Sequence, residues 1–246
     1  MNCLLVDNSN TRTKFALWSP EKEMEVRIVP TAELSLIRLA DLLRDWCFDE
    51  VYIWSVVPQV AALVAQACAD AKVHYINYQS STAVDFSGYR GVETLGADRV
   101  ADVLGAVQQL ERPLVAVDLG TATTYDVVCD KDGTPVFKGG LIAPGIASMA
   151  ASLQARTAQL PLVTDWQREV IIGQDTQEAM GAALRIGYPA MVDAILDSIE
   201  RELGEKINVV LTGGDAAAIA PLLRRSCKID PLLTLRGIAF AAGIQL

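Results

Sequence analysis

The chain has 246 residues, 51% hydrophobic residues and a formal net charge of -9. This length and apolar content can build one large α/β domain or two closely packed lobes. The acidic balance, with no basic run longer than Arg224 and Arg225, argues against nucleic acid or an anionic membrane surface as a partner. No segment reads as a membrane span or a signal peptide, so we expect a cytoplasmic protein.

The first part of the chain predicts the order β-β-β-α-β-α-β. The apolar residues 4–6 end on Asp7, and strand-like residues 13–18 follow a polar turn. This is the pattern of a buried hairpin with an acid at its turn. The elements expected next are an edge-like strand, an amphipathic helix capped by Pro30 and Thr31, a buried strand, a second helix and a short strand, over residues 23–29, 31–47, 51–57, 58–68 and 73–76.

Residues 77–94 have no periodicity and are rich in Ser, Thr, Asp, Gly and Tyr. A loop of this length in a compact domain is usually functional or mobile, and Phe86, Tyr89 and Arg90 suit contacts to a small molecule. An ordered structural loop is the alternative. A helix over residues 100–110 follows. Asp98 and Arg99 precede it, either as a cap with a dipole-favoured acid or as functional residues.

A second acid-tipped hairpin lies near the middle of the chain. The apolar residues 114–117 end on Asp118, and a second β-branched run reaches residue 129. The turn offers what a phosphate needs: Gly120 for close backbone approach, hydroxyls including that of Thr121, and a carboxylate for a cation. Two such hairpins, about half a chain apart, predict two lobes of one ancestral design facing each other across a cleft.

The remaining elements repeat this plan. We expect a strand over 134–142, helices over 146–155 and 176–203, a strand over 208–211, and helices over 216–223 and 233–243. Residues 212–215 form either a glycine turn that holds a nucleotide or a plain tight turn. Gly181 and Gly187 inside the long helix cost about 1 kcal/mol each relative to Ala, a cost that close approach of a helix or ligand would justify.

Cysteine and histidine content argues against a metal centre built from these residues. The five cysteines are widely spaced in apolar contexts, which favours core thiols in a reducing compartment. His74 is the only histidine, and we expect it to be structural, because a zinc site or a Ser/His/Asp triad needs more partners. A Walker A motif, a G-x-G-x-x-G motif and a protein-kinase catalytic loop are all missing from the sequence.

The duplicated plan resembles the actin-like superfamily of ATPases and sugar kinases, which hold ATP and Mg²⁺ between two lobes. The resemblance implies an α/β fold of two actin-like (ribonuclease H-like) lobes, residues 1–111 and 112–246. Each lobe would be a mixed sheet flanked by helices, with the active site in the interlobe cleft.

Within that superfamily the chain resembles the type III pantothenate kinases. The motif D-x-G-N-T-x-x-K is matched by residues 7–14 except at one position, G-x-D-R by residues 96–99, and D-x-G-T-A-T-T by residues 118–124. Shorter family elements are P-G, T-x-x-L-P, T-G-G-D and T-L-R-G, at residues 144–145, 157–161, 212–215 and 234–237. These motifs occur in the family's order along essentially the whole chain.

This resemblance implies ATP-dependent phosphorylation of pantothenate to 4'-phosphopantothenate, the first step of coenzyme A biosynthesis. Asp98 would accept the proton of the substrate hydroxyl, Asp7 would bind Mg²⁺, and Asp118 would bind the monovalent cation, K⁺ or NH₄⁺. The implied ATP-binding residues are Asp7, Asn8, Ser9, Asn10, Thr11, Arg12, Thr13, Lys14 and Thr121. The implied substrate-binding residues are Tyr89, Gly96, Ala97, Asp98, Arg99 and Thr176. A homodimer is implied as well, with the partner subunit closing the pantothenate pocket.

One position departs from the family pattern, because Ser9 stands where the first phosphate turn has Gly. A side chain there disfavours positive φ, so Ser9 either weakens ATP binding or donates its hydroxyl from an allowed conformation. Three hypotheses remain. The first is an active pantothenate kinase, and the second is a weak or non-catalytic relative that serves as a ligand-sensing or accessory binding protein. The third is a kinase or phosphatase of the same superfamily that acts on another small molecule.

Overall fold

The computed structural model describes residues 2–244, which group into two compact units. The first unit comprises the described chain up to Gln109, the segment Val128–Lys138 and the chain from Leu232 onward. The second comprises Leu110–Val127 and Gly139–Pro231. These units are groups of residues in mutual contact, and the boundary of the duplicated lobes between residues 111 and 112 stays a prediction.

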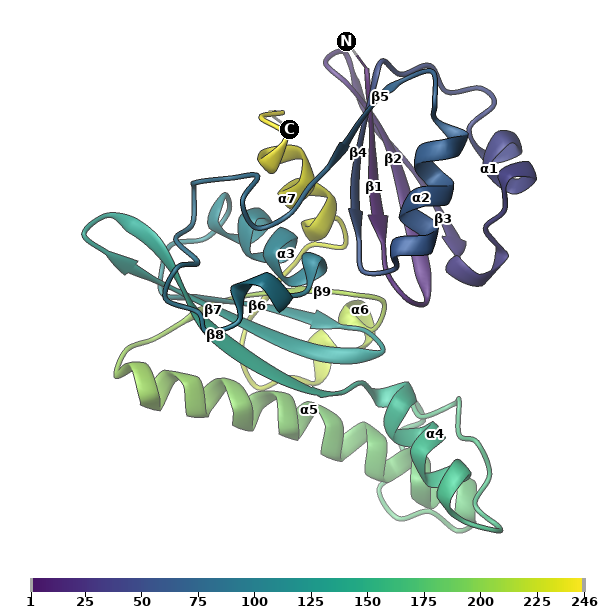
Figure 1. Ribbon diagram of the computed structural model, residues 1–246. Coiled ribbons are helices and arrows are strands. Elements are labelled where there is room, and N and C mark those ends of the chain that lie inside the picture. Colours follow the sequence, from purple (N-terminus) through teal and green to yellow (C-terminus); the bar gives the residue numbers. More distant parts are fainter. Residues whose placement is uncertain (1, 245–246) are drawn as a thin grey trace. The chain divides into compact units, whose positions relative to one another are not determined.

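The sheet of the first unit has five strands in the order β3-β2-β1-β4-β5. Their bounds are β1 Cys3–Asn8, β2 Arg12–Ser19, β3 Lys22–Pro30, β4 Glu50–Ser55 and β5 Lys72–Tyr75. The first three strands are antiparallel neighbours, and β4 and β5 add in parallel beside β1. Helices α1 (Leu36–Leu42) and α2 (Pro58–Ala67) cover one face (Figure 1). Alternate residues of β1 and β4, such as Leu4, Val6 and Ile53, fill the core beneath them.

The helix expected over residues 31–47 is shorter than predicted. Thr31–Glu33 forms a 3-10 turn, and α1 begins only after Ser35, whose hydroxyl accepts a hydrogen bond from Arg38 N at 3.2 Å. Ser35 is therefore the N-cap, in place of Pro30 and Thr31. Beyond the other end of α1, the Arg27 guanidinium donates to the Leu42 carbonyl and to Asp45. The 3.6-residue apolar period thus continues past both ends of the real helix.

The second sheet repeats the strand order of the first. Its strands are β6 Leu114–Leu119, β7 Ala122–Lys131, β8 Thr134–Pro144, β9 Asn208–Thr212 and β10 Lys228–Ile229, in the order β10-β9-β6-β7-β8. In both sheets the first strand is central, with the second and third on one side and the fourth and fifth on the other. The predicted α/β fold of two mixed sheets flanked by helices is confirmed.

Three α-helices belong to the second unit: α4 (Ile146–Arg156), α5 (Thr176–Leu203) and α6 (Ala216–Ile219). The predicted helix 216–223 is wrong in its second half, where a 3-10 turn over Ala220–Leu222 replaces it. Helix α5 has the predicted bounds and runs along one face of the sheet (Figure 1). The Thr123 and Tyr188 hydroxyls, 2.5 Å apart, link β7 to α5.

Among the described residues, α5 is the one helix long and apolar enough to cross a membrane. Half of its most apolar window is buried inside the protein, as in the core helix of a globular domain. Near its C-terminal end, Asp193, Asp197 and Glu200 form ion pairs with Arg224 and Arg225. These contacts support a role for α5 in the core of its unit.

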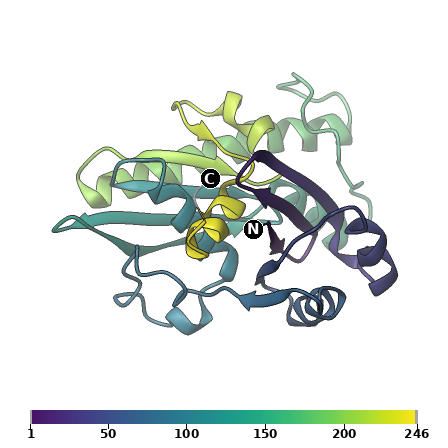
Figure 2. The ribbon, with the colours of Figure 1, turned by 90° about the horizontal axis from the view of Figure 1, so that it is seen from above.

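Helices α3 (Ala97–Val107) and α7 (Leu233–Ala241) lie side by side in the first unit (Figures 1 and 2). A short 3-10 turn, Val92–Thr94, precedes α3. Helix α3 is buried on all sides from Arg99 to Ala106. It starts three residues earlier than the helix predicted over 100–110, so Asp98 belongs to its first turn.

The predicted core role holds for two of the cysteines. Cys3 and Cys68 are buried, and burial raises the pKa of the Cys68 thiol to about 11. Cys47 is exposed, so the predicted core role is wrong for this cysteine. His74 stacks on the ring of Tyr52 at 4.7 Å, and its Nε2 lies 3.2 Å from Glu50 Oε2, contacts that fit a structural histidine.

Candidate active site

The turn between β1 and β2 carries the first predicted phosphate site. Asn10, Thr11 and Arg12 are exposed at its tip, whereas Asn8 and Thr13 are buried as a cross-strand pair at its base. The sequence motif names all five alike. Asn10 and Thr11 are exposed because they lie in the turn, beyond the last strand pair of Asn8 and Thr13. Arg12 precedes Thr13 on β2 and so points to the opposite face of the strand.

The buried pair belongs to a hydrogen-bonded chain beneath the turn. Asn8 Nδ2 donates to Thr13 Oγ1 at 2.8 Å, and Ser55 Oγ donates to Asn8 Oδ1 at 2.5 Å. Thr31 Oγ1 donates its only proton to the Ser9 carbonyl at 2.7 Å. In the 3.0 Å bond between the Thr13 and Thr31 hydroxyls, Thr13 is therefore the donor and Thr31 the acceptor. The Asn8 and Thr13 side chains therefore hold the turn from within. Thr31 and Ser55 were missed because they are distant in sequence.

Ser9 adopts an allowed backbone conformation. Among the described residues Asp132 is the only non-glycine residue with positive φ, so Ser9 avoids the left-handed region. Its Oγ donates to the Arg12 carbonyl at 2.8 Å, and its backbone N donates to the same oxygen at 3.2 Å. The serine closes the turn with an extra hydrogen bond and without the backbone strain that the substitution for Gly suggested.

Asp7, at the end of β1, is 6% exposed and pairs in register with Lys14 of β2. Lys14 Nζ lies 3.3 Å from Asp7 Oδ2. Burial raises the pKa of Asp7, Lys14 opposes this effect, and the negative charge of Asp98 raises the pKa further. Asp7 and Asp98 are thus close enough to interact within the first unit. A buried carboxylate beside a second acid suits a hard cation.

The raised pKa predicts that Asp7→Asn stabilises the fold at neutral pH. In the unfolded chain Asp7 loses its proton at lower pH than in the folded chain, so its contribution to stability falls as pH rises through the folded pKa. Thermal melts of the variant should show a higher Tm than the parent at neutral and mildly alkaline pH. The gain should vanish at acidic pH, where Asp7 is protonated in both states.

A matched control is Asp45→Asn. Hydrogen bonds from Arg27 lower the pKa of Asp45, so this substitution should change stability in the opposite direction above the acid range. A lower Tm for Asp7→Asn at neutral pH would contradict the destabilising role of the Asp7 charge.

Asp98 lies in the first turn of α3, directly after Gly96 and Ala97. Its Oδ1 accepts a hydrogen bond from Arg99 N at 2.8 Å. The N-cap of α3 is Gly96 and no side chain caps the helix, so the capping role predicted as an alternative is wrong, while Asp98 is an acid in the first turn, where the helix dipole favours it. A Cβ added at Gly96 would come within 2.6 Å of this oxygen. Glycine at position 96 therefore leaves the space in which the Asp98 carboxylate lies.

Phe137 of β8 brings Tyr89 and Arg99 together. The Tyr89 ring packs edge-on against it at 5.1 Å, and the Arg99 guanidinium lies 5.9 Å from its ring centre. The loop that carries Tyr89 is held by Asp85, which donates from N to the Pro135 carbonyl at 2.8 Å and accepts from Phe137 N at 2.9 Å. The loop is thus an ordered one. Phe137 was missed because nothing in a predicted strand distinguishes an aromatic that packs in the core from one beneath a site.

The second predicted phosphate turn, between β6 and β7, is held by the start of α4. The Thr121 carbonyl accepts from Gly145 N at 3.0 Å and from Ser148 Oγ at 2.6 Å. A Cβ at Gly145 would overlap the Gly120 carbonyl. The P-G element therefore supports this turn, while residue 121 itself is exposed.

The glycine turn after β9 lies directly against Asp118. Asp118 and Thr212 are register partners, and Asp215 N donates to the Leu119 carbonyl at 3.0 Å. Gly213 has φ +91°, and a Cβ there would overlap the Asp118 carboxylate and the Leu119 carbonyl. Burial raises the pKa of Tyr188 to about 12, and the charges of Asp215 and Asp118 add to this. A carboxylate beside carbonyl oxygens is a donor set that fits a monovalent cation.

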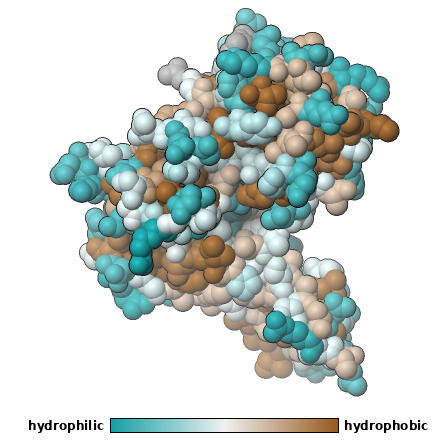
Figure 3. Space-filling view, viewed as in Figure 1, coloured by the Kyte–Doolittle hydropathy of each residue, from teal (hydrophilic) through white to brown (hydrophobic). Residues whose placement is uncertain are grey.

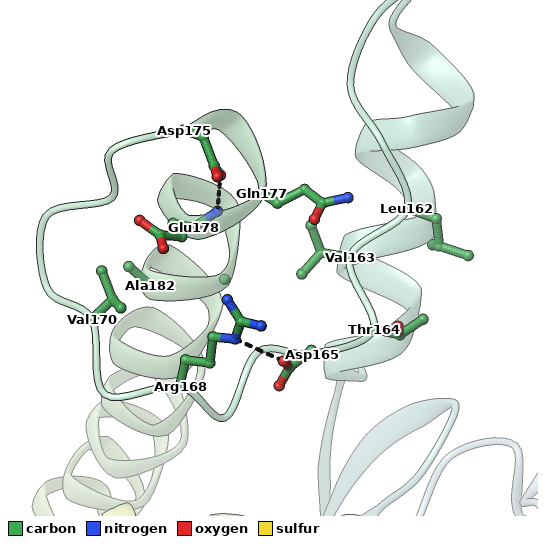
Figure 4. Close-up of a pocket in the computed structure, with 11 residues that line it drawn as sticks. Leu162, Val163, Thr164, Asp165, Arg168, Val170, Asp175, Gln177, Glu178 and Ala182 are labelled. Atoms are coloured by element: carbon green, nitrogen blue, oxygen red, sulfur yellow. Dashed lines mark hydrogen bonds and ion pairs between the residues drawn. The ribbon is translucent and has the colours of Figure 1, made fainter.

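Thr176 lies apart from both turns in the chain, as the first residue of α5. Asp175 caps this helix by accepting from Glu178 N at 2.8 Å, and Thr176 is exposed. A cavity of about 170 Å³ lies beside the first turns of α5, between the helix and the segment that precedes it (Figure 4). Its lining includes Asp165 and Arg168, which form an ion pair at 2.9 Å.

The two glycines within α5 differ in what surrounds them. A Cβ at Gly181 would lie 3.4 Å from the Asp165 carbonyl, so close approach explains this glycine. Nothing lies within 4 Å of a Cβ at Gly187, where the predicted close approach is wrong for contacts within the chain.

No group of three or more His, Cys, Asp or Glu side chains able to hold a metal ion occurs within residues 2–244. A magnesium ion here would instead share one or two carboxylates with phosphate oxygens and water, which is its usual arrangement at nucleotide sites. The buried Asp7 carboxylate fits that arrangement.

Comparison with solved structures supports the fold. The chain is similar to a protein from Campylobacter jejuni described as a Baf family transcriptional activator, with a TM-score of 0.58, 18% identity, and coverage of 98% of this chain and 97% of the other. It is also similar to a glucokinase from an Antarctic psychrotroph, with a TM-score of 0.54, 11% identity and 98% coverage of both chains. At these identities the likeness concerns the fold alone.

Sequence comparison identifies the family. The family model described as type III pantothenate kinase matches residues 3–198. A type III pantothenate kinase of Akkermansia muciniphila is 41% identical, with 100% of both chains covered. Those of Methylacidiphilum infernorum and Chlorobaculum parvum are 35% and 36% identical, over 99% and 96% of this chain and 89% and 92% of theirs. The chain therefore belongs to the type III pantothenate kinase family.

Proposed function

We propose that this chain phosphorylates pantothenate to 4'-phosphopantothenate, with ATP as the donor, and so opens coenzyme A biosynthesis. Family membership along the full chain supports the reaction. The observation that carries the assignment of residues is the buried Asp7 carboxylate at the first predicted phosphate turn, 6% exposed and 3.3 Å from Lys14 Nζ, with the charge of Asp98 near enough to raise its pKa.

The roles of the first unit follow from the chemistry of phosphoryl transfer. The reaction needs phosphates whose charge is neutralised and an acceptor hydroxyl with a base aligned on it. Asp98 is the proton acceptor. Lys14 and the exposed residues Asn10, Thr11 and Arg12 bind the phosphates, and the side chains of Asn8, Ser9 and Thr13 hold the turn in shape. Asp7 would hold Mg²⁺, which neutralises phosphate charge when bound.

The substrate contacts come from α3 and its surroundings. Arg99, fixed over Phe137, supplies a guanidinium for the pantothenate carboxylate. Tyr89 packs on the same ring, and Gly96 and Ala97 provide backbone at the start of the helix. Thr176 contributes a further hydroxyl to the substrate site.

The second unit supplies the cation and the other phosphate contact. Asp118 would hold K⁺ or NH₄⁺ against the glycine turn of residues 212–215, and Thr121 binds phosphate from the exposed turn between β6 and β7. The close approach of Gly213 to both the Asp118 carboxylate and the Leu119 carbonyl supports this assignment, because it shows a second oxygen donor beside that acid.

We also propose a cytoplasmic homodimer. The second unit exposes large apolar side chains, and Figure 3 shows apolar surface among the polar residues around α4 and the start of α5. Ile171 and Ile172 are 78% and 79% exposed, and Ile142 of the edge strand β8 is 65% exposed. A symmetric contact between two copies would bury such residues.

The direct test is ADP release coupled to a spectroscopic readout, with pantothenate, Mg²⁺ and K⁺ present. We expect ADP release that depends on pantothenate and a product of the mass of 4'-phosphopantothenate. Folded protein without pantothenate-dependent turnover would overturn the proposal.

The hypothesis of a non-catalytic relative was supported by Ser9, and the allowed backbone at this residue removes that support.

Ser9→Gly is expected to lower stability without improving catalysis. The variant loses the hydrogen bond to the Arg12 carbonyl and gains freedom in the unfolded chain, which together cost about 1 kcal/mol. Since Ser9 carries no backbone strain, kcat/KM for ATP should stay within about threefold of the parent, a change below about 1 kcal/mol. Denaturant unfolding and steady-state kinetics measure the two effects.

Ser9→Ala is the control that removes the hydroxyl alone. A tenfold gain in kcat/KM for Ser9→Gly would show that Ser9 impairs ATP binding.

A further inference from the structure

The T-L-R-G element at the start of α7 packs on α3, the helix that carries Asp98. Thr234 Oγ1 donates a hydrogen bond to Asp102 Oδ1 at 2.8 Å. Both residues are buried, with 4% and 1% of their surfaces exposed. A buried carboxylate requires hydrogen-bond donors, so loss of this one would leave Asp102 less well satisfied.

Two glycines bring the helix backbones into contact beside this bond. A Cβ at Gly105 of α3 would overlap the Leu233 carbonyl, and a Cβ at Gly237 of α7 would overlap the Ala101 carbonyl. The helices therefore meet backbone to backbone at two points, one on either side of the Thr234–Asp102 bond in the α3 sequence. At such a crossing α3 has little freedom to slide or rotate.

Asp102, the residue to which Thr234 donates its hydrogen bond, lies one helical turn after Asp98. Residues i and i+4 share a helix face, so Asp98 and Asp102 lie on the same side of α3. Helix α7 also contacts β1, the strand that leads to Asp7. One helix thus touches both the element that carries the proton acceptor and the element that carries the first phosphate turn, all within one unit.

We propose that Thr234 is a positioning residue for Asp98, acting through its hydrogen bond to Asp102. This inference rests on the proposed role of Asp98 as proton acceptor. The bond fixes the first turns of α3, so the Asp98 carboxylate keeps its position relative to the turn that binds ATP. Thr234 itself has no contact with the reacting atoms in this role.

The test is Thr234→Val, which has the same shape but lacks the hydroxyl, beside Thr234→Ser, which keeps it. A small displacement of a catalytic group can cost about a hundredfold in rate, and we expect kcat to fall by about 10- to 100-fold in Thr234→Val. KM for ATP should stay within about twofold, since the chain Asn8–Thr13–Thr31 holds the phosphate turn independently. Thr234→Ser should restore most of kcat.

A double-mutant cycle with Asp98→Asn separates positioning from a general structural effect. If Thr234 acts through Asp98, Thr234→Val should have almost no further effect on kcat once Asp98 is replaced. A merely structural role would lower Tm and leave kcat of the folded enzyme near that of the parent. A fall in kcat that appears in full in the Asp98→Asn background as well would show that Thr234 acts independently of Asp98, and would overturn the proposal. A folded Thr234→Val with kcat within about twofold of the parent overturns the proposal. Thr234→Ala takes its place if Val does not fold.

Amide hydrogen exchange provides a readout that does not depend on turnover. Exchange in the first turns of α3 should be at least about tenfold faster in Thr234→Val than in Thr234→Ser, with α2 unchanged as an internal reference. A parent protein without turnover would refute the proposed function, and the exchange data would still show whether Thr234 anchors α3. Equal exchange rates in the two variants would refute that anchoring.

Discussion

Asp98→Asn should lower kcat for pantothenate phosphorylation by about a thousandfold while the protein stays folded. A positioned general base typically contributes about 10²- to 10⁴-fold, and the Asn side chain is a very weak base. The amide oxygen can still accept the hydrogen bond from Arg99 N, so the start of α3 should persist. KM for ATP should change little, because the proposed role of Asp98 concerns the acceptor hydroxyl. Steady-state kinetics with varied ATP and pantothenate measure both parameters.

Asp85→Asn is the matched control for this variant. Its carboxylate also accepts a hydrogen bond from a nearby backbone amide, that of Ser87 at 2.8 Å, and it belongs to the same unit. Its kcat should remain close to that of the parent. If Asp98→Asn retained a tenth or more of the activity, that is, lost less than about 1.4 kcal/mol of transition-state stabilisation, another group would have to accept the proton.

The fold was largely predictable because its signals are local. Residues 4–6 and 114–117 are apolar runs that end on acids, and both became central strands, β1 and β6. The bounds of α5 were predicted correctly, since Asp175 gives a side-chain cap and Gly204 a left-handed C-cap. The helix over 31–47 failed because its apolar period continues beyond the residues that actually cap it.

For the site the sequence proposes a set of residues, but it does not give their geometry. A motif names Asn8 and Asn10 together, but only the structure reveals that Asn8 is buried at the end of β1, where it supports the turn, and that Asn10 is exposed in the turn itself. Phe137 and Thr31 contribute from other strands or turns, and their roles depend on contacts between residues far apart in sequence. The same holds for Thr234, which is 132 residues from its partner Asp102.

Ser9 shows why a departure from a motif has to be examined in three dimensions. From sequence, a residue other than glycine in a phosphate turn suggests strain at positive φ. In the structure the turn is closed by two hydrogen bonds to the Arg12 carbonyl, and neither requires that conformation. The substitution therefore leaves the prediction of an active enzyme intact.

Asp118→Ala should remove activation by monovalent cations and lower kcat in K⁺ by about 10- to 100-fold. The proposed site consists of the Asp118 carboxylate and nearby carbonyl oxygens, and the carboxylate supplies its charge. Without that charge the site should no longer hold K⁺, and the variant should have equal activity in K⁺ and Na⁺. KM for pantothenate should change by less than about threefold, because its proposed contacts lie mainly on α3 and the loop that carries Tyr89.

The control for Asp118→Ala has to remove a like charge while leaving the turn unchanged. Asp132→Asn, at the tip of the β7–β8 hairpin, meets that need, because Asn tolerates the positive φ of 54° found there. Its activation by K⁺ should match that of the parent. Equal activity of the parent in Na⁺ and K⁺ would contradict the cation assignment, since a site of carboxylate and carbonyl oxygens in a fixed turn should prefer one ionic radius. A loss of pantothenate binding in Asp118→Ala, with cation activation preserved, would instead move Asp118 from the cation site to the substrate site.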